Sequence, residues 1–157
     1  MISNQKNKPI GSKPVLDTVV IGAGFAGLYQ LYKLKQLGLQ TIVFEAGSDV
    51  GGTWYWNRYP GARCDVESMA YSYSFSEELE QEWVWTERYA SQPEILEYAR
   101  HVAERFGLKK DIQFNTRVLK VTFEANNHRW LVTTSKNQTF IARFVIMALG
   151  CLSYTHS

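Results

Sequence analysis

The chain has 157 residues, of which 45% are hydrophobic and 14% aromatic, enough apolar material for one buried core and not comfortably for two. A net charge of +2 with 20% charged residues gives no strongly basic surface, so we expect no nucleic-acid partner and no binding to a membrane surface. The longest apolar run, residues 144–149, is far shorter than the roughly 20 residues that cross a bilayer. These properties predict a single domain without a membrane span.

The first 14 residues of the chain are mostly polar. Residues 1–14 hold three lysines but no apolar segment of the kind found in secretory signals, so we expect a disordered leader, a domain over 15–152 and a short tail over 153–157. The two cysteines, Cys64 and Cys151, form no disulfide framework, and no Cys or His spacing is typical of a metal site. We therefore expect no metal and a reducing, cytoplasmic environment.

The first elements predict a βαβ unit. Residues 17–21 are rich in β-branched side chains and predict a strand, and the apolar positions of 28–37 have the spacing of a helix that Gly38 ends. Residues 40–45 predict a second strand, parallel to the first. Residues 46–76 show no lasting periodicity but many Trp, Tyr and Gly residues, which is typical of a long functional loop.

The second half predicts one helix and a set of strands. A capping box from Ser91 to Glu94 opens a helix over 93–107 that ends at Gly107. Three strands separated by turn residues predict an antiparallel meander, and a final strand over 144–148 is expected back in the parallel sheet. The meander strands are 117–123, 129–134 and 139–143. The fold class is α/β: a Rossmann-like parallel sheet with helices and an antiparallel β-meander in three layers.

The glycines that follow the first strand form a dinucleotide-binding fingerprint. Gly22 permits the tight turn, Gly24 lets a pyrophosphate approach the backbone, and Gly27 lets the helix pack closely on the strand. The amides of Phe25 and Ala26 then lie at a helix N-terminus, where free N–H groups favour an anion. The position of the motif between a strand and a helix makes it specific.

Glu45 stands at the end of the second strand, where a carboxylate can accept hydrogen bonds from both ribose hydroxyls. A ribose 2′-phosphate would be repelled there, so the pattern favours an unphosphorylated adenosine ribose. The plain alternative is a strand-end glutamate that faces water beside a glycine turn that binds nothing. The agreement of three glycines, strand, helix and acid favours the binding site.

The run GGTWYWNRYPGARCDVES, residues 51–68, resembles the segment after the first fingerprint of Baeyer-Villiger monooxygenases. These enzymes use FAD, NADPH and O2 to insert one oxygen atom beside a ketone carbonyl, giving an ester or lactone. The similarity extends over about residues 17–152. Without it, Trp54 and its aromatic neighbours would be interpreted as loop packing.

The resemblance implies a role for individual residues. It implies that Gly52, Thr53 and Trp54 contact the flavin and its ribityl-pyrophosphate arm. The isoalloxazine would lie beside Asp65 and Tyr71, and Asp65 would orient a catalytic arginine from a later segment. The further implied contacts are the backbone of Val118 with the adenine, and Arg63 and Cys64 on the side where the nicotinamide docks.

Several features of the whole enzymes are missing from the sequence. The catalytic arginine, a second glycine fingerprint for NADPH and the linking signature are absent, and Leu149 replaces the threonine usual in the Ala-Thr-Gly segment. We therefore expect an incomplete FAD domain that is inactive as an oxygenase by itself. In the complete enzyme, the partners would be NADPH, O2 and a small ketone; the sequence does not indicate which ketone or which oligomeric state.

Two other functions stay open. A flavin monooxygenase that oxygenates amine nitrogen or thioether sulfur shares the double-fingerprint design, and a non-catalytic flavin-binding remnant is the alternative outside enzymes. We assign no catalytic or binding role to the three histidines or to two further tryptophans. We expect the histidines to be solvent-exposed and the tryptophans to lie in a strand or packed loop: His101, His128, His156, Trp83 and Trp85.

Overall fold

The computed structural model describes residues 14–152, so the expected leader up to residue 13 and the 153–157 tail lie outside the described residues. One six-stranded sheet has the strand order β3-β2-β1-β6-β5-β4. Neighbours from β3 to β6 are parallel, and β6, β5 and β4 pair antiparallel. The strands are β1 (Val15–Ile21), β2 (Thr41–Phe44), β3 (Ile112–Gln113), β4 (Val118–Glu124), β5 (Arg129–Thr134) and β6 (Thr139–Met147).

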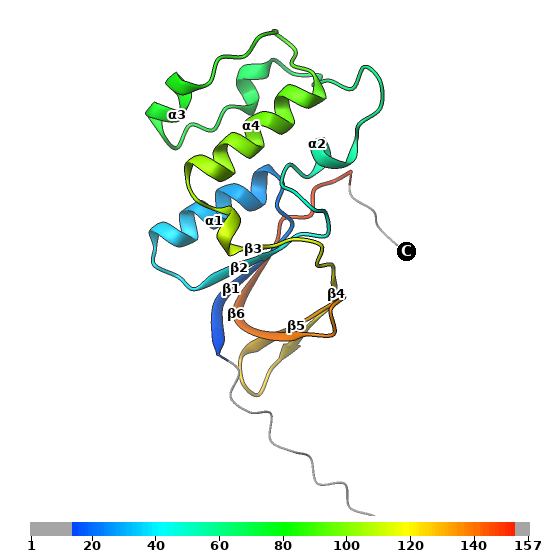
Figure 1. The fold of residues 1–157 in the computed structure, drawn as a ribbon. Coiled ribbons are helices and arrows are strands. Elements are labelled where there is room, and N and C mark those ends of the chain that lie inside the picture. Colours follow the sequence, from blue (N-terminus) through cyan, green and yellow to red (C-terminus); the bar gives the residue numbers. More distant parts are fainter. Residues whose placement is uncertain (1–13, 153–157) are drawn as a thin grey trace, which may run out of the picture.

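The helices lie on one side of the parallel strands, and β4 and β5 lie on the other (Figure 1). This arrangement confirms the predicted α/β class with its three layers. The helices are α1 (Phe25–Gln36), α2 (Thr53–Trp56), α3 (Glu77–Glu82) and α4 (Gln92–Arg105), with 3₁₀ turns η1 (Ser68–Tyr71) and η2 (Lys109–Asp111).

The apolar end of β1, residues 19–21, is buried on both faces of the sheet. Val20 packs into the cluster beneath α1 and α4, with Leu28, Leu31 and Ala99. Val19 and Ile21 point to the opposite face, toward the meander. The core is therefore divided by the sheet. The meander side is closed by contacts such as Phe44 with Phe140, whose ring centroids are 4.8 Å apart.

The expected division between a meander strand over 139–143 and a separate strand over 144–148 is wrong. Residues Thr139–Met147 form one strand, β6. Its first part pairs antiparallel with β5, as Thr139 does with Thr133, while Ile141 to Met147 pair in parallel with β1. No turn residue interrupts the run, so a single long strand joins the meander to the parallel sheet.

The helix predicted over 93–107 is present as α4, but the expected capping box is not. Ser91 is the N-cap residue and its side chain makes no capping hydrogen bond. The Glu94 carboxylate accepts instead from the backbone N–H and the hydroxyl of Thr86, at 2.7 and 3.0 Å. Thr86, eight residues earlier in the segment that leads into α4, thus takes the place of the capping contact for Glu94, and Pro93 already fixes the first turn.

The segment predicted as one loop, 46–76, contains the short α2 and η1, and it is followed by the unpredicted α3. Ser76 caps α3, since its Oγ accepts from the backbone N–H of Leu79 at 3.2 Å. Leu79 is fully buried beside Tyr98. These elements are too short to show periodicity, which explains why the pattern did not predict them.

Trp83 and Trp85 lie in a packed loop against α4 and contact Tyr98. The ring of Trp83 also lies 5.4 Å from that of His101, whose Nε2 is 3.5 Å from a Glu82 carboxylate oxygen. His101 is therefore half-buried and not fully solvent-exposed as expected, because Trp83 covers part of its ring. His128 is exposed as expected, and His156 lies outside the described residues.

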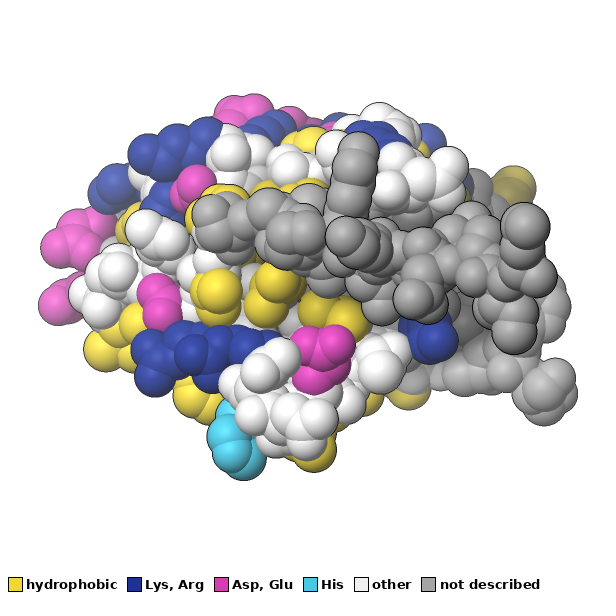
Figure 2. All heavy atoms as spheres, turned by 90° about the horizontal axis from the view of Figure 1, so that it is seen from below, with side chains coloured by type: hydrophobic (Ala, Val, Ile, Leu, Met, Phe, Trp, Pro, Cys, Tyr) yellow, Lys and Arg dark blue, Asp and Glu magenta, His cyan; other side chains and the backbone are white. Residues whose placement is uncertain are grey.

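Seen from below, the surface shows hydrophobic side chains between charged ones (Figure 2). Exposed hydrophobic residues on the strands include Leu119 and Phe123 on β4 and Phe144 on β6. Within residues 14–152, no helix has the length and apolar character needed to span a membrane. Over the same residues, no group of three or more His, Cys, Asp or Glu side chains could hold a metal ion.

Candidate cofactor site

The turn after β1 has a backbone path that only glycine allows. Gly22 has φ +100°, and a Cβ there would lie 2.6 Å from the carbonyl oxygen of Ala148. A Cβ on Gly27 would lie 1.9 Å from the carbonyl oxygen of Gly22. Packing of α1 on the strand end therefore requires glycine at these two positions.

The N-terminus of α1 presents free backbone donors. Gly24 is the N-cap residue, no side chain caps the helix, and the first turn contains no acidic residue. The amides of Phe25 and Ala26, which belong to this turn, face no competing side-chain acceptor, and Ala26 is exposed. An anion is the ligand that such a helix end accepts most readily.

A second glycine segment lies against the first. A Cβ on Gly52 would come within 2.8 Å of the Gly24 Cα, so the two backbones are in direct contact. Gly52 has φ 55° and ψ −117°, a conformation that disfavours any side chain. The amide of Gly51 also donates to the carbonyl oxygen of Ala23 at 3.0 Å. The structure thus brings together the two glycine motifs, which lie far apart in the sequence.

Glu45 joins these segments from the end of β2. It is 5% exposed, and its two carboxylate oxygens accept hydrogen bonds from the amides of Ala23 and Gly47, both at 2.7 Å. The carboxylate therefore organises the glycine turn, a role that the sequence did not indicate. Each oxygen retains further acceptor capacity, so the predicted bonds to ribose hydroxyls stay compatible with this geometry.

The aromatic part of the site is built by α2 and η1. Trp54 is buried, its backbone carbonyl accepts from the Gln92 side chain, and its ring meets that of Tyr71 edge-on at 5.5 Å. Tyr71 also meets Phe25 edge-on at 5.6 Å. Burial raises the pKa of Tyr71, with smaller contributions from Cys64 and Asp65. Thr53, at the start of α2, is partly buried.

The predicted residues 63–65 differ in their surroundings. Arg63 donates to the Glu87 carboxylate and to the carbonyl of Tyr89, both at 2.9 Å. Cys64 is a buried small residue in the cluster around Trp54. Asp65 is exposed and makes no hydrogen bond or ion pair with any residue of the described part of the chain. Its carboxylate is thus available to a partner.

Val118 begins β4, close to the end of β2. The connecting segment is held there because the amides of Thr116 and Asn115 donate to the carbonyl oxygens of Glu45 and Gly47, both at 2.8 Å. The predicted adenine contact therefore lies on a segment that is tied to the predicted ribose contact. Val118 itself packs against the cluster between the sheet and the meander.

Two residues near Glu45 were missed by sequence reasoning. A Cβ on Gly47 would lie 2.6 Å from the ring of Tyr55, so this glycine allows Tyr55 to cover the turn. The Tyr55 hydroxyl accepts from the amide of Ser48 at 3.1 Å and shares a hydrogen bond with its side chain, which lowers the Tyr55 pKa. The sequence signal that could have indicated this contact is Gly47 itself, two positions after Glu45 at the end of the strand.

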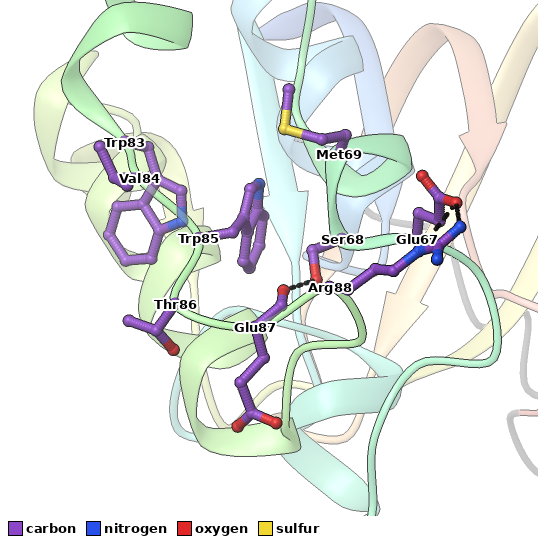
Figure 3. A pocket seen from close by; sticks show the side chains of 9 residues that line it. All are labelled: Glu67, Ser68, Met69, Trp83, Val84, Trp85, Thr86, Glu87 and Arg88. Atoms are coloured by element: carbon purple, nitrogen blue, oxygen red, sulfur yellow. Dashed lines mark hydrogen bonds and ion pairs between the residues drawn. The ribbon is translucent and has the colours of Figure 1, made fainter.

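Two hollows lie near these elements. One, of about 400 Å³, is bordered by Phe25, Ala26 and Tyr71, three of the predicted site residues. The other, of about 350 Å³, is formed by residues 67–69 and 83–88, and Trp83, Trp85 and Met69 stand around it in Figure 3. None of the predicted site residues lines the second hollow. The chemistry of the glycine turn favours the first as part of a ligand site.

A family model described as pyridine nucleotide-disulphide oxidoreductase matches residues 19–157, and the chain belongs to this family. Phenazine N-monooxygenase from Lysobacter antibioticus is 47% identical over 154 residues, 98% of this chain and 27% of that protein. A Baeyer-Villiger monooxygenase from Pseudooceanicola batsensis is 43% identical over 156 residues, 99% of this chain and 28% of that protein. The predicted resemblance is confirmed, and the chain spans about a quarter of these relatives' length.

Solved structures agree with the sequence relatives. An oxidised steroid monooxygenase bound to NADP superposes with a TM-score of 0.88 at 55% identity, covering 92% of this chain and 28% of that chain. An OTEMO complex with FAD and NADP superposes with a TM-score of 0.86 at 45% identity, covering 93% and 27%. At these identities, the described fold is that of the matching part of flavoprotein monooxygenases.

Proposed function

We propose that this chain is the FAD-binding part of a flavin-dependent monooxygenase that uses NADPH and O2 to convert ketones to esters or lactones. The convergence of three segments on the N-terminus of α1 carries the proposal: the glycine turn, Glu45 and Gly52. Flavin binding is proposed for the chain itself. Ketone oxygenation is proposed for the whole protein, because the chain spans 28% of its Baeyer-Villiger relative.

The residues fit an adenine dinucleotide. The amides of Phe25 and Ala26 would bind the pyrophosphate, while Gly24 and Gly52 leave its approach free of side chains. Glu45 would accept from the ribose hydroxyls, and the backbone of Val118 would border the adenine. When bound, FAD supplies redox chemistry that no amino-acid side chain provides.

The aromatic segment fits the flavin end. Thr53, Trp54 and Tyr71 would border the isoalloxazine, and the unpaired Asp65 would orient an arginine supplied by another part of the whole protein. Of the two residues proposed for the nicotinamide side, only Arg63 presents an exposed side chain, since Cys64 is buried. A small ketone and O2 complete the proposed partners.

Cytoplasmic location is part of the same proposal. Both cysteines in the chain are free, Cys64 in the core and Cys151 at the surface. An exposed free thiol is usual where glutathione keeps thiols reduced.

A second candidate is oxygenation of an amine or aromatic nitrogen. It is supported by the 47% identity to a phenazine N-monooxygenase, which is higher than the 43% identity to the Baeyer-Villiger monooxygenase reported above. Substrate profiling of a form with the length of the relatives separates the two, because only a ketone enzyme produces an ester.

The test of flavin binding is retention of FAD after incubation and desalting, read from the visible absorption of the purified chain. We expect FAD to be retained. NADP+, measured by the ultraviolet absorption of the ligand released on denaturation, should not be retained, because Glu45 repels a 2′-phosphate. A chain that emerges colourless at every FAD concentration contradicts the proposal for this chain.

Ala26→Asp tests whether the N-terminus of α1 binds the pyrophosphate. An acid in the first turn of α1 stabilises the helix by about 0.5 kcal/mol but repels a pyrophosphate, so we expect FAD affinity to fall about tenfold or more while the melting temperature of the apo chain stays or rises. Ala26→Asn, of equal size and no charge, is the matched control and should have the smaller effect on affinity. Equal affinities for the two variants would exclude the helix end as the anion site.

A further inference from the structure

Asp49 lies in the segment between Glu45 and Gly52 and is not itself among the residues assigned to the cofactor. One carboxylate oxygen accepts from Arg100 Nε on α4 at 2.7 Å, and the other lies 4.0 Å from the ammonium of Lys109. The Arg100 side chain is 36% exposed and that of Asp49 23% exposed. The pair is thus partly shielded from water, and it connects this segment directly to α4.

The segment that carries Asp49 is the one that closes the glycine turn. Val50 is fully buried in the cluster with Ala99 of α4, and a Cβ on Gly51 would meet Leu96 at 2.5 Å. Gly51 donates to the Ala23 carbonyl, and Gly47 donates to Glu45. A shift of the segment away from α4 would therefore disturb Gly51, Gly47 and the Gly52–Gly24 contact together.

We propose that Arg100, through its ion pair with Asp49, is a positioning residue for the dinucleotide site and holds residues 47–52 against the glycine turn. This inference rests on the proposed flavin binding. Arg100 contacts no cofactor-binding residue directly, and its role is to limit the arrangements of the segment before a ligand arrives. Preorganisation of this kind raises affinity by lowering the ordering that binding requires.

Arg105 provides the matched control. It lies on the same helix and pairs with Glu82 at 2.9 Å, and its side chain is 39% exposed. Its partner belongs to α3, which carries no cofactor-binding residue. Arg100→Gln removes the pair with Asp49 and a second pair with Glu97 on α4 itself, at 3.1 Å, whereas Arg105→Gln removes the pair with Glu82. Of these pairs, only that with Asp49 touches residues 47–52.

Two measurements on the full chain test the proposal. Amide hydrogen exchange without flavin reads the segment itself: Arg100→Gln should accelerate exchange at Ala23, Gly47 and Gly51 by roughly threefold to fivefold, and Arg105→Gln should leave them unchanged. In an FAD titration, only Arg100→Gln should lose affinity, by roughly threefold to fivefold. Arg100→Lys, which keeps the charge, should lie between wild type and Arg100→Gln in both.

The positioning role of Arg100 and the proposed flavin binding can fail independently of each other. If wild type binds no FAD, the proposed function fails, and exchange alone decides whether Arg100 positions the segment. Equal exchange at the three amides in the two glutamine variants overturns the positioning role. If Arg100→Gln accelerates exchange at these amides but leaves FAD affinity unchanged, Arg100 does not position the segment for the dinucleotide site.

Discussion

At the scale of single residues, the glycine turn is fixed by packing before any ligand binds. Gly27 meets the backbone of Gly22, and Gly22 meets that of Ala148, so neither position has room for a side chain. Glu45 adds two charge-assisted hydrogen bonds to backbone amides. The spacing of the glycines predicted the turn and its direction. It did not predict that Glu45, the acid proposed to bind the ribose, also supports the turn, because that contact depends on how two strands are placed side by side.

Gly27→Ala tests the role of close packing. The added methyl group would lie 1.9 Å from the Gly22 carbonyl oxygen, so α1 must move, and we expect a loss of about 3 kcal/mol of stability in thermal or urea unfolding. Gly107→Ala is the control, since its φ is +58° and no atom lies within 4 Å of the added Cβ. It should lose about 1 kcal/mol, the cost of a left-handed alanine. Equal losses for the two variants would mean that α1 does not depend on the close contact.

At the scale of elements, α4 connects the segments that border the site. Arg100 binds Asp49, Glu94 binds Thr86, and Tyr98 accepts a hydrogen bond from the backbone N–H of Tyr73 at 2.7 Å. The apolar spacing of α4 predicted the helix and its buried face. The polar contacts could not be predicted, because Asp49, Thr86 and Tyr73 come from loops without periodicity.

Tyr98→Phe measures how much the hydrogen bond between Tyr98 and the backbone of Tyr73 contributes to stability. The ring stays buried in its aromatic cluster while the N–H of Tyr73 loses its acceptor, so we expect the free energy of unfolding to fall by about 1–2 kcal/mol. Tyr89→Phe, at an exposed tyrosine whose ring lies beneath Arg88, should change stability by less than about 0.5 kcal/mol. Comparable losses in the two variants would show that the Tyr98 hydroxyl contributes little.

At the scale of the whole molecule, β6 leaves one edge open. Its pairing with β5 ends at Ala142, while its pairing with β1 continues to Met147. Among the described residues, none pairs with the outer edge beyond Ala142. Phe144 is 57% exposed and Met147 70% exposed along this part of the strand. An open apolar edge of this kind is a site for pairing between chains.

We therefore expect the chain to self-associate as its concentration rises, in a way that Phe144→Lys reduces, because a charge on an edge strand opposes pairing. Light scattering over a concentration series measures this. Leu37→Lys is the control, since Leu37 is 72% exposed but follows α1, away from the sheet edge. A wild-type chain that stays monomeric throughout, or an equal effect of the two lysine variants, would contradict the expectation.

Local sequence patterns were enough to predict the βαβ opening, the glycine turn, α4 and the strands β4 and β5, because each depends on local periodicity or on turn residues within a short window. Residues 51–68 were enough to predict the family. Four features became visible only in the folded chain: β6 is one strand, Glu45 binds the turn, Gly52 touches Gly24 and Arg100 reaches Asp49. These contacts join residues distant in sequence, and their geometry is set by the packing of α4 and β2 around β1, which no local pattern encodes.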